Sequence, residues 1–575
     1  MINVISLKTA TLEPDFFGTV KSIMARCLYE RSGVVMSEDV SKGADSMVLR
    51  LEYDKALHSD GYRISENSGQ FLIESDSKSG VLSGLGRFLR DGILSTEGFT
   101  QGSFRGEEFP AKPFRGIYFA SHFYNFYHSA PLDKIHRLQE DLALWGQNIQ
   151  TLWYDMHHYS AIDDPESLEF AARMKAIMKH ANTLGVKTVY LGLANEAFNS
   201  SPKELRAEWA IQNGYVRHPH SHYELELCPS KPGGMEKIIE YRLQTLKLYK
   251  EVEPDYFTFW PYDQGGCTCE GCAPWGGVGF LKCVKTLIPL IKEIWPKTRI
   301  ILSGWFFERF YPGEWDRFFE ETTKDGFPYT DFADYFMAYF PDNIFGETFN
   351  VPKQITEGQL PAGLPLIDFP EISMQGAFPW GGFGANPQPK WLQSIENKTG
   401  QLYKGGYAYS EGIFEDINKA IILSLYSGRH TCAVEAIREY TRYEFSAELA
   451  NEITEILCLM EETLPHWRED TNSPEAPAPC RFILGNTQHV DEVYNRTMAV
   501  DAKLDEKTRT GWRWRLVYLR AKIDYQLTHN NFYNTPASDM CFRELAKLYH
   551  VTDKSFYAVT PPASETLYKE RGKEM

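Results

Sequence analysis

The chain has 575 residues and a formal net charge of −17. This length predicts two or three domains, and the charge argues against a nucleic-acid partner because a phosphate-binding surface has to be basic. Hydrophobic residues make up 43% and charged residues 24%, which is typical of a globular protein with a large core. The sequence has no run of about 18 apolar residues, so we expect neither a membrane span nor a membrane partner.

The N-terminal stretch MINVISLKTATLEPDFF carries neither the basic nor the apolar region of a signal peptide. Without such a signal, the ten cysteines are typical of cytosolic thiols or metal ligands rather than of a disulfide framework. We therefore expect a cytoplasmic protein.

A small α/β domain is expected over residues 1–108. Alternating apolar residues predict strands, and apolar residues at helical spacing predict two helices. The strand segments are 4–12, 47–53 and the two halves of 60–76, and the helical segments are 16–33 and 79–91. The following stretch EEFPAKPF contains two prolines and predicts a linker into the next domain.

A (β/α)8 TIM barrel is expected over residues 109–428, because short aromatic-rich strands alternate there with amphipathic helices about eight times. The expected strands are 115–121, 149–155, 186–193, 255–263, 298–305, 333–340, 364–371 and 405–412. After about Ser427 we expect no further strands. Long amphipathic segments at 432–470 and 510–530 predict a helical C-terminal domain over residues 429–575.

The active site of such a barrel lies at the carboxyl ends of its strands, so the residues that end each strand are the candidates. In strand order they are His122, Tyr124 and Asn125; Asp155, His157 and His158; Asn195 and Glu196; Asp263; Trp305 and Glu308; Asp342; Glu371; Tyr409 and Glu411. Glycoside hydrolysis needs two carboxyl groups beside the scissile bond and aromatic faces that stack on the sugar. A single carboxylate at a strand end is often only a loop cap, so it is the cluster that indicates a glycosidase.

Two motifs support this interpretation by resemblance. The helix GVLSGLGRFLR (80–90) and the segment FRG (114–116), followed by a barrel, resemble the layout of β-hexosaminidases of glycoside hydrolase family 20. The O-GlcNAcases of family 84 and the α-glucuronidases of family 67 share that layout. The chain also resembles uncharacterised bacterial hydrolase-like chains that carry WPYD and YSEGIFEDINK, here residues 260–263 and 409–419. The resemblance implies a hexosaminidase-like N-terminal domain and an exo-acting glycosidase.

The sequence departs from family 20 at one decisive position. That family places an Asp-Glu pair at the end of the fourth strand, with the Glu as proton donor, whereas this chain has Asp263-Gln264. An amide cannot donate a proton as a general acid, so either Asp263 is the acid or the acid comes from another strand.

Strands four and seven face each other across the mouth of many glycosidase barrels, which favours Asp263 as acid and Glu371 as nucleophile or base. Glu411 and Glu196 are the competing candidates. A raised pKa would keep the acid protonated, and an apolar wall such as Trp260 or Trp380 would supply the desolvation. The expected substrate-binding residues are His122, Tyr124, Asn125, Asp155, His157, His158, Trp260, Gln264, Trp305, Trp380 and Tyr409.

Three cysteines form the pattern C-x-C-x2-C: Cys267, Cys269 and Cys272. A structural zinc site usually has four ligands, and Cys228 in the neighbouring loop is the expected fourth. Cys283 lies closer in sequence but is expected to face the core from a helix. Four thiolates would close the coordination sphere, which indicates a structural zinc ion. Unligated thiols and redox chemistry are the alternatives.

A second metal hypothesis uses Asp155 with His122, His128, His157 and His158, since histidine and carboxylate can hold a catalytic metal. Sugar binding or loop capping is the alternative role for each of them. No organic cofactor is expected, because the sequence has no phosphate loop and no G-x-G-x-x-G after a strand.

The sequence therefore predicts a glycoside hydrolase that acts on small oligosaccharides or glycosides and is β-N-acetylhexosaminidase-like or related. A non-catalytic carbohydrate-binding protein and a metal-dependent sugar isomerase or lyase are the alternatives. The expected partner is a small carbohydrate, and a homodimer is left open.

Overall fold

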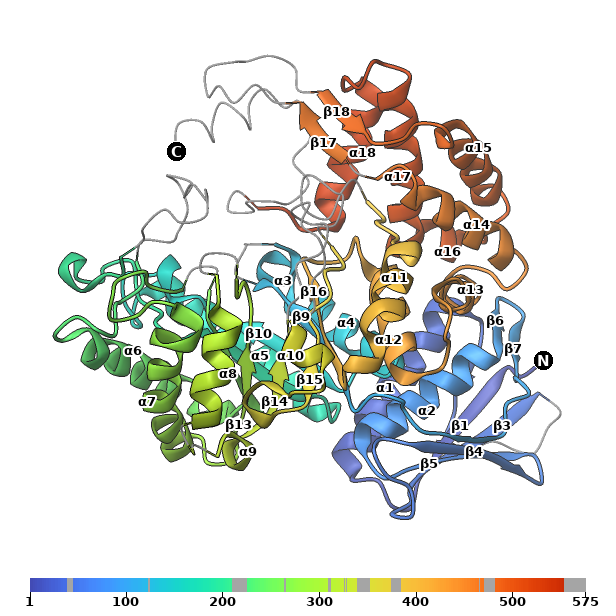
Figure 1. Ribbon diagram of the computed structural model, residues 1–575. Coiled ribbons are helices and arrows are strands. Elements are labelled where there is room, and N and C mark those ends of the chain that lie inside the picture. Colours follow the sequence, from blue (N-terminus) through green and yellow to red (C-terminus); the bar gives the residue numbers. More distant parts are fainter. Residues whose placement is uncertain are drawn as a thin grey trace.

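The computed structural model arranges the chain as three regions that follow one another in sequence (Figure 1). It describes residues 1–38, 45–121, 125–208, 225–262, 265–308, 312–324, 326, 328–338, 352–373, 384–464, 466–469 and 481–552. An α/β domain comes first, an eight-stranded parallel barrel second and a mainly helical region third. The predicted fold class is therefore confirmed, while the domain boundaries 108/109 and 428/429 stay predictions.

The N-terminal domain is a mixed six-stranded sheet with strand order β2-β1-β3-β5-β4-β8. Its strands are β1 (Val4–Lys8), β2 (Val35–Met36), β3 (Ser46–Tyr53), β4 (Tyr62–Asn67), β5 (Gln70–Ser75) and β8 (Gly106–Glu108). β4 and β5 form the predicted hairpin, and Ser68 and Gly69 at its turn have φ values of 53° and 76°. Positive φ at both turn residues matches the right-handed twist of the paired strands.

Two helices complete this domain, α1 (Pro14–Arg31) and α2 (Lys78–Asp91). The hydroxyl of Ser77 accepts a hydrogen bond from the N–H of Gly80 at 3.1 Å and caps α2. The apolar side chains of α2 pack on the sheet, and its glycines allow a barrel helix to approach on the other side. A Cβ at Gly86 would lie 1.9 Å from the carbonyl oxygen of Leu144. The helix that carries the family 20 resemblance thus joins the domain to the barrel.

The barrel sheet has the strand order β15-β14-β13-β12-β11-β10-β9-β16, all parallel. The strands are β9 (Phe114–Phe119), β10 (Ile149–Trp153), β11 (Lys187–Leu193), β12 (Tyr256–Trp260), β13 (Arg299–Ser303), β14 (Ala333–Met337), β15 (Leu366–Ile367) and β16 (Gly405–Ser410). Single bridges between Asp368 and Gly406 and between Glu371 and Tyr409 close the ring between β15 and β16. Each of the eight predicted strand segments overlaps one of these strands, and only β9 begins one residue earlier than predicted.

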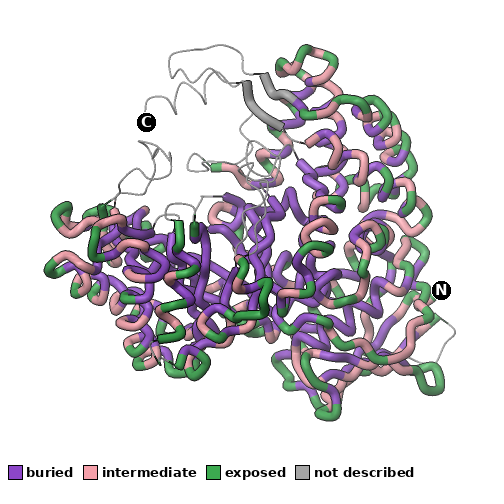
Figure 2. The backbone as a smooth tube through the Cα atoms, viewed as in Figure 1, coloured by how far each residue is buried: buried purple, intermediate pink, exposed green. Residues whose placement is uncertain are grey.

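The helices around the barrel cover its outer face, so that the strands are buried on both sides (Figure 2). They are α4 (Leu132–Leu144), α5 (Pro165–Thr183), α6 (Gly234–Leu248), α7 (Gly279–Ile294), α8 (Glu314–Lys324), α11 (Pro389–Thr399) and α12 (Asp416–Ser427). Among the described residues, the connection from β14 to β15 contains only the short helices α10 (Lys353–Thr356) and η6 (Pro361–Gly363).

The C-terminal region consists mainly of helices that stack beside the N-terminal domain (Figure 1). They are α13 (Ala433–Glu444), α14 (Ala450–Glu461), α15 (Val490–Asp501), α16 (Glu506–Thr510), α17 (Trp512–Thr528) and α18 (Pro536–Leu548). Within the described residues, no helix is both long and apolar enough to cross a membrane.

The expectation that strands stop after Ser427 is wrong. β17 (His466–Glu469) and β18 (Arg481–Leu484) form an antiparallel pair inside the helical region. The segment 432–470, taken as long amphipathic helix, is instead two helices and a strand. Proline at position 465 explains the change, because it lacks the N–H that a continuing helix requires.

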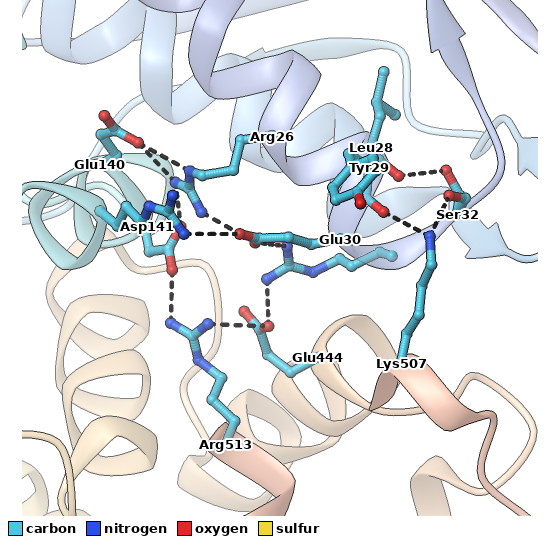
Figure 3. Close-up of polar contacts among 12 residues, drawn as sticks. Arg26, Leu28, Tyr29, Glu30, Ser32, Glu140, Asp141, Glu444, Lys507 and Arg513 are labelled. Atoms are coloured by element: carbon cyan, nitrogen blue, oxygen red, sulfur yellow. Dashed lines mark hydrogen bonds and ion pairs between the residues drawn. The ribbon is translucent and has the colours of Figure 1, made fainter. Parts of the chain in front are cut away.

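The three regions meet at a network of ion pairs beside a cavity of about 800 Å³ (Figure 3). Arg26 of α1 contacts Asp141 of α4 at 2.7 Å, and Arg513 of α17 contacts the same carboxylate at 2.8 Å. Arg31 of α1 is paired with Glu444 of α13. Side chains from every region therefore neutralise one another where the regions join.

Candidate active site

An aromatic floor lies inside the barrel below its carboxyl-end mouth. Trp260, Trp305 and Phe369 form a triangle of rings whose centroids are 5.1, 5.1 and 5.2 Å apart. Tyr118 and Tyr409 continue the cluster, 5.9 and 5.8 Å from Phe369. Alternate strand residues point to the same face, and these side chains come from five different strand ends, so they line the barrel axis.

Glu411 is a buried carboxyl group one residue beyond β16. It shares the inward face with Tyr407 and Tyr409, because side chains alternate along the strand. The hydroxyl of Tyr409 donates a hydrogen bond to one of its oxygens, and the amide of Asn125 donates to the other at 2.6 Å. Burial raises the pKa of Glu411 to about 8. This carboxyl group is therefore protonated at neutral pH.

Glu371 lies beside Glu411 in the closing segment of the ring. It is bridged to Tyr409 in the parallel register, and it is two residues beyond Phe369 and so on the inward face. Its Oε1 accepts hydrogen bonds from the backbone N–H of Ser373 at 2.6 Å and from the hydroxyl of Ser373 at 2.9 Å. Two donors on one oxygen stabilise a carboxylate. The charges of both Glu371 and Glu411 act on Tyr409, raising its pKa well above its usual value, in addition to the effect of its burial.

Glu196 points in a different direction from Glu371 and Glu411. It follows the turn that ends β11, and it lies near the guanidinium of Arg242 from α6, which an added Cβ at Gly192 of β11 would also meet. One oxygen of Glu196 accepts hydrogen bonds from the indole of Trp153 at 3.0 Å and the N–H of Met156 at 3.1 Å, and the other pairs with Arg242 at 3.2 Å. Burial raises the pKa of Glu196 to about 7. Its contacts join two strand ends to a helix of the outer layer.

Asp155, His157 and His158 gather at the end of β10. Nδ1 of His157 pairs with Asp155, and Nε2 of His158 lies 3.4 Å from the other oxygen of the same carboxyl group. The potential ligand atoms of all three residues lie within 4.8 Å of one another. Burial lowers the pKa of His157 to about 3, so this imidazole is neutral. The group could hold a metal ion or bind polar ligand groups.

Several predicted site residues lie outside the described residues: His122, Tyr124, Asp263, Gln264, Asp342 and Trp380. Their described neighbours still define part of their surroundings. Trp260 belongs to the aromatic floor, and the hydroxyl of Tyr262 donates to Glu314 at 2.6 Å. His128, part of the second metal hypothesis, stacks on Phe170 with ring centroids 5.0 Å apart.

Two buried carboxyl groups near the strand ends were not anticipated, Glu314 and Glu415. Glu314 also accepts hydrogen bonds from the N–H of Gly276 at 2.7 Å and of Glu308 at 2.9 Å, and burial raises its pKa to about 8. Glu308, a predicted strand-five residue, in turn accepts from the N–H groups of Gly313 and Trp315 and holds the start of α8. The signal for Glu415 was present in sequence as the charged segment EDINK after Glu411.

The predicted cysteine cluster is present, with Cys228 as its fourth member. The Sγ atom of Cys228 lies 3.6 Å from that of Cys269 and 3.7 Å from that of Cys272, and all four Sγ atoms lie within 4.8 Å of one another. These separations exceed the ~2.05 Å of a disulfide and approach the ~3.8 Å edge of a tetrahedron with metal–sulfur bonds of about 2.3 Å. Cys283 lies apart, buried in α7, as expected. The four thiols could therefore bind a metal.

Asn195, which ends the third strand, holds the two loops of this cluster together. Its amide donates to the carbonyl oxygens of Leu227 at 2.9 Å and Gly266 at 3.0 Å, and its own oxygen accepts from the N–H of Gly266 at 3.0 Å. Leu227 and Gly266 each precede a cysteine of the cluster. The cluster is thus attached directly to the strand end beside Glu196.

The fold is a parallel (β/α)8 barrel with an α/β domain before it, and it is similar to the folds of several solved glycoside hydrolases. No protein-family model and no curated protein sequence matches the chain. Solved structures do match, and the predicted resemblance to the layout of glycoside hydrolases is confirmed at the level of the fold.

One similar structure is a 4-O-methyl-α-glucuronidase of family GH115 with specificity for decorated arabinogalactans. The TM-score is 0.56 at 10% identity, over 97% of this chain and 77% of that chain. A family 89 glycoside hydrolase from Clostridium perfringens, in complex with GlcNAc-α-1,4-galactose, gives 0.58 at 11% identity. That match covers 93% of this chain, which spans only 62% of the larger enzyme. A GH138 enzyme targeting pectin rhamnogalacturonan II gives 0.53 at 10% identity, over 99% and 98% of the two chains.

Proposed function

We propose that the protein is a glycoside hydrolase whose active site lies at the carboxyl-end mouth of the barrel. The observation that carries this proposal is the pair of buried carboxyl groups, Glu371 and Glu411, on adjacent strand ends beside an aromatic floor. Glycoside hydrolysis requires one protonated and one ionised carboxyl group at the scissile bond. The similarity in fold to three families of glycoside hydrolases supports the same conclusion.

The two carboxyl groups suit different roles. Glu411, with a pKa raised to about 8, would give its proton to the glycosidic oxygen as the bond to the leaving sugar breaks. Glu371, held by two donors from Ser373, would act as nucleophile at the anomeric carbon or as base on a water molecule. Tyr409 orients Glu411, and Trp260 and Trp305 would stack on the sugar. Asp263, which the sequence favoured as the acid, lies outside the described residues and is the competing candidate for this role.

Amide variants of the four candidate carboxyl groups test this assignment. Glu371→Gln and Glu411→Gln should each reduce hydrolysis of the cleaved substrate by about 100-fold or more, the range of general acid–base catalysis. The substrate is found with a panel of p-nitrophenyl glycosides. Asp263→Asn and Glu196→Gln complete the series, and Glu357→Gln, at an exposed position, is the matched control.

Near-full activity in both the Glu371 and Glu411 variants would contradict the assignment. A large loss with Asp263→Asn and none with Glu411→Gln would transfer the acid role to Asp263.

We further propose that the enzyme removes a terminal sugar from small oligosaccharides or glycosides and is β-N-acetylhexosaminidase-like or related. The family 89 relative was solved with GlcNAc-α-1,4-galactose, and the other two relatives act on arabinogalactan and on pectin. End-labelled oligosaccharides test this: release of single sugars from one end supports exo action, and internal cleavage products contradict it.

We propose zinc as the ion held by Cys228, Cys267, Cys269 and Cys272. The separations between the sulfur atoms suit a tetrahedral ion, and four thiolates leave no position for a reactive water, so the role would be structural. The N–H of Glu208 donates to Sγ of Cys267 at 3.4 Å, as N–H groups around bound thiolates do. Metal analysis of the purified protein should find about one zinc per chain.

The Asp155–His157–His158 group supports a second candidate, a metal-dependent sugar isomerase or lyase. A chelator distinguishes the glycosidase from the isomerase or lyase, because hydrolysis by Glu371 and Glu411 needs no metal at the Asp155–His157–His158 group. Chelator-sensitive turnover of a free sugar would favour the second candidate. Binding of glycosides without turnover would instead favour a carbohydrate-binding protein.

A further inference from the structure

The first turn of α12 lies directly behind both candidate catalytic segments. It follows the loop that carries Glu411, and its residues Asn418 and Lys419 are 0% exposed although both are polar. A lysine is almost never buried to this extent unless a specific partner holds it. The glycosidase roles assigned above do not use either side chain.

Asn418 holds the segment that follows Glu371. Its Nδ2 donates to the carbonyl oxygen of Ile372 at 2.8 Å and to that of Asn386 at 2.6 Å, and its Oδ1 accepts from the N–H of Gln388 at 2.8 Å. The amide of Asn386 adds a bond of 2.8 Å to the carbonyl oxygen of Ser373, the residue that holds the Glu371 carboxylate. Ile372, Asn386 and Gln388 are therefore all hydrogen-bonded to the buried side-chain amide of Asn418.

Glu415 and Lys419 hold the loop that carries Glu411. Oε1 of Glu415 accepts from the N–H of Gly412 at 2.7 Å and from the hydroxyl of Ser410 at 2.5 Å, so it holds the residues on either side of Glu411. The ammonium of Lys419 donates to the carbonyl oxygen of Gly412 and lies 3.7 Å from the same carboxylate. Both side chains of this ion pair are 0% exposed.

We infer that Asn418 and the Glu415–Lys419 ion pair are positioning residues, which together fix the distance and orientation between Glu371 and Glu411. This inference rests on the proposed glycosidase function. Asn418 and Lys419 are adjacent in sequence on the same helix. The segment that carries Glu371 and the loop that carries Glu411 are therefore both hydrogen-bonded to α12. Holding reacting groups within a fraction of an ångström is worth about 100-fold in rate.

The ion pair also sets the charge around Glu411. The negative charge of Glu415 raises the pKa of Glu411, in addition to its burial. Among the described residues, the titratable groups around Glu411 are Tyr409 of β16, Glu371 of the closing segment, Tyr127 of α3 (Phe126–Ser129), Tyr549 after α18, and Glu415, Asp416 and Lys419 at α12. Removal of either member of the pair should therefore move the titration of Glu411, in opposite directions.

The decisive experiment compares Glu415→Gln with Lys419→Met. Glu415→Gln removes a negative charge and should lower the pKa of Glu411, so the alkaline limb of kcat/KM should move to lower pH by about 0.5 unit or more. Lys419→Met removes the positive charge beside Glu415. The remaining negative charge should raise the pKa of Glu411 and move that limb to higher pH. Lys419→Arg, which keeps the charge, should restore the wild-type profile. Limbs that stay in place in both variants would overturn the inference.

Asn418→Ala tests the position of Glu371. We expect kcat to fall about 10- to 100-fold while KM stays within about threefold, because the substrate still binds but the carboxylates are misplaced. Asn397→Ala, at an exposed position on α11, is the matched control and should leave both constants unchanged. Equal kcat values for Asn418→Ala and wild type would overturn the role of Asn418.

A second readout keeps this test independent of turnover. Carbon NMR of the protein labelled at its glutamate carboxyl carbons follows the titration of Glu411 directly, with Glu411→Gln to assign the signal. Wild-type protein that hydrolyses no glycoside would contradict the proposed function alone. A Glu411 titration unmoved by Glu415→Gln would contradict the inference, whatever the activity.

Discussion

Burial raises the pKa of several carboxyl groups of the barrel, among them Glu196 and Asp368 to about 7, and Glu314 and Glu411 to about 8. Of these four groups, Glu411 is the one that the proposed mechanism places beside a substrate. Glu314 binds three donors from the loops after β12 and β13, and Asp368 accepts from the hydroxyl of Tyr426 in α12. A raised pKa by itself therefore does not single out a candidate acid, and the proposed role of Glu411 rests also on its position on the inward face.

These groups make stability depend on pH in a defined direction. A carboxyl group whose pKa is raised in the folded state stays protonated there while the unfolded chain has lost the proton, so stability falls as pH rises towards the folded pKa. Burial lowers the pKa of His157, so this imidazole stays neutral in the folded protein while it gains a proton in the unfolded chain below about pH 6.5. Below that pH, stability therefore falls as the pH is lowered. Between about pH 7 and 8 the carboxyl groups alone should determine the slope.

We predict that the free energy of unfolding decreases from pH 7 to pH 8, by about 1.4 kcal/mol for each group that stays protonated. Denaturant titrations at several pH values measure this slope. Glu314→Gln carries no titratable proton and should have a shallower slope than wild type. A stability that rises over this window would contradict the prediction.

The identity of the inward-facing residues could be predicted from sequence in part. Trp260 and Trp305 end apolar strands, and the alternation of side chains is enough to place them on the barrel axis. Glu196 lies beyond the end of β11 and after a turn, so alternation says nothing about its direction, and only its ion pair with Arg242 shows that it points towards α6. The hydrogen bonds of Asn418 could not be predicted, because they join segments of chain that only the closed barrel brings together.

At the scale of single elements, the cysteine loop is the part of the chain whose structure we expect to depend most on a bound ion. The loop from Cys267 to Cys272 is attached to Cys228 through sulfur contacts and to the third strand through Asn195. Like-charged thiolates at these distances repel one another unless a cation lies between them. The conformation of the loop from Cys267 to Cys272 should therefore depend on the proposed metal.

We predict that Cys272→Ser lowers the bound zinc to well below one per chain and lowers the thermal unfolding midpoint. Removal of zinc from the wild type by chelator should have the same effect on the midpoint. Cys432→Ser, at a partly exposed cysteine outside the cluster, should change neither the zinc content nor the midpoint. A wild-type protein free of stoichiometric metal would end the zinc proposal.

Elements with a strong pattern were predictable, and elements fixed by distant contacts were not. The aromatic strands β9 to β14 and β16 have enough alternating or continuous apolar residues to be recognised. β15 has only two residues, and isolated bridges to β16 extend its pairing. β17 follows a helix directly in sequence, so only the proline at 465 marked the change.

At the scale of the whole molecule, Arg513 connects the three regions to the candidate site. Its guanidinium contacts Asp141 of α4 at 2.8 Å, Asp416 at the start of α12 at 2.7 Å and Glu444 of α13 at 3.6 Å. Asp141 in turn pairs with Arg26 of the N-terminal domain. The helix that positions the candidate carboxylates is thereby joined to residues of both flanking regions.

We predict that Arg513→Met lowers the free energy of unfolding by about 3–5 kcal/mol, because it leaves the buried carboxylate of Asp416 without its arginine and removes one of the two arginines around Asp141 and around Glu444. Denaturant unfolding measures the effect. Arg509→Met, at an exposed arginine of α16, is the control and should change stability by less than about 0.5 kcal/mol. Unchanged stability in the Arg513 variant would show that the network contributes nothing there.

The order of the three regions and the barrel followed from patterns along the chain, since each region has its own core or its own run of helices. The way in which the regions join did not follow, because Arg26, Asp141 and Arg513 are charged residues on otherwise ordinary helices. Only their meeting in space distinguishes them from solvated surface charges.

The partners of Glu411 have a consequence for biosynthesis. Its side chain is held by Asn125, 286 residues earlier, and its carbonyl oxygen by the hydroxyl of Tyr549, 138 residues later. A ribosome delivers residues from the N-terminus at about 5–20 per second, so Glu411 and its last partner emerge many seconds apart. We expect the nascent chain to stay catalytically silent until Tyr549 has been made, and to acquire activity only after this residue has reached Glu411.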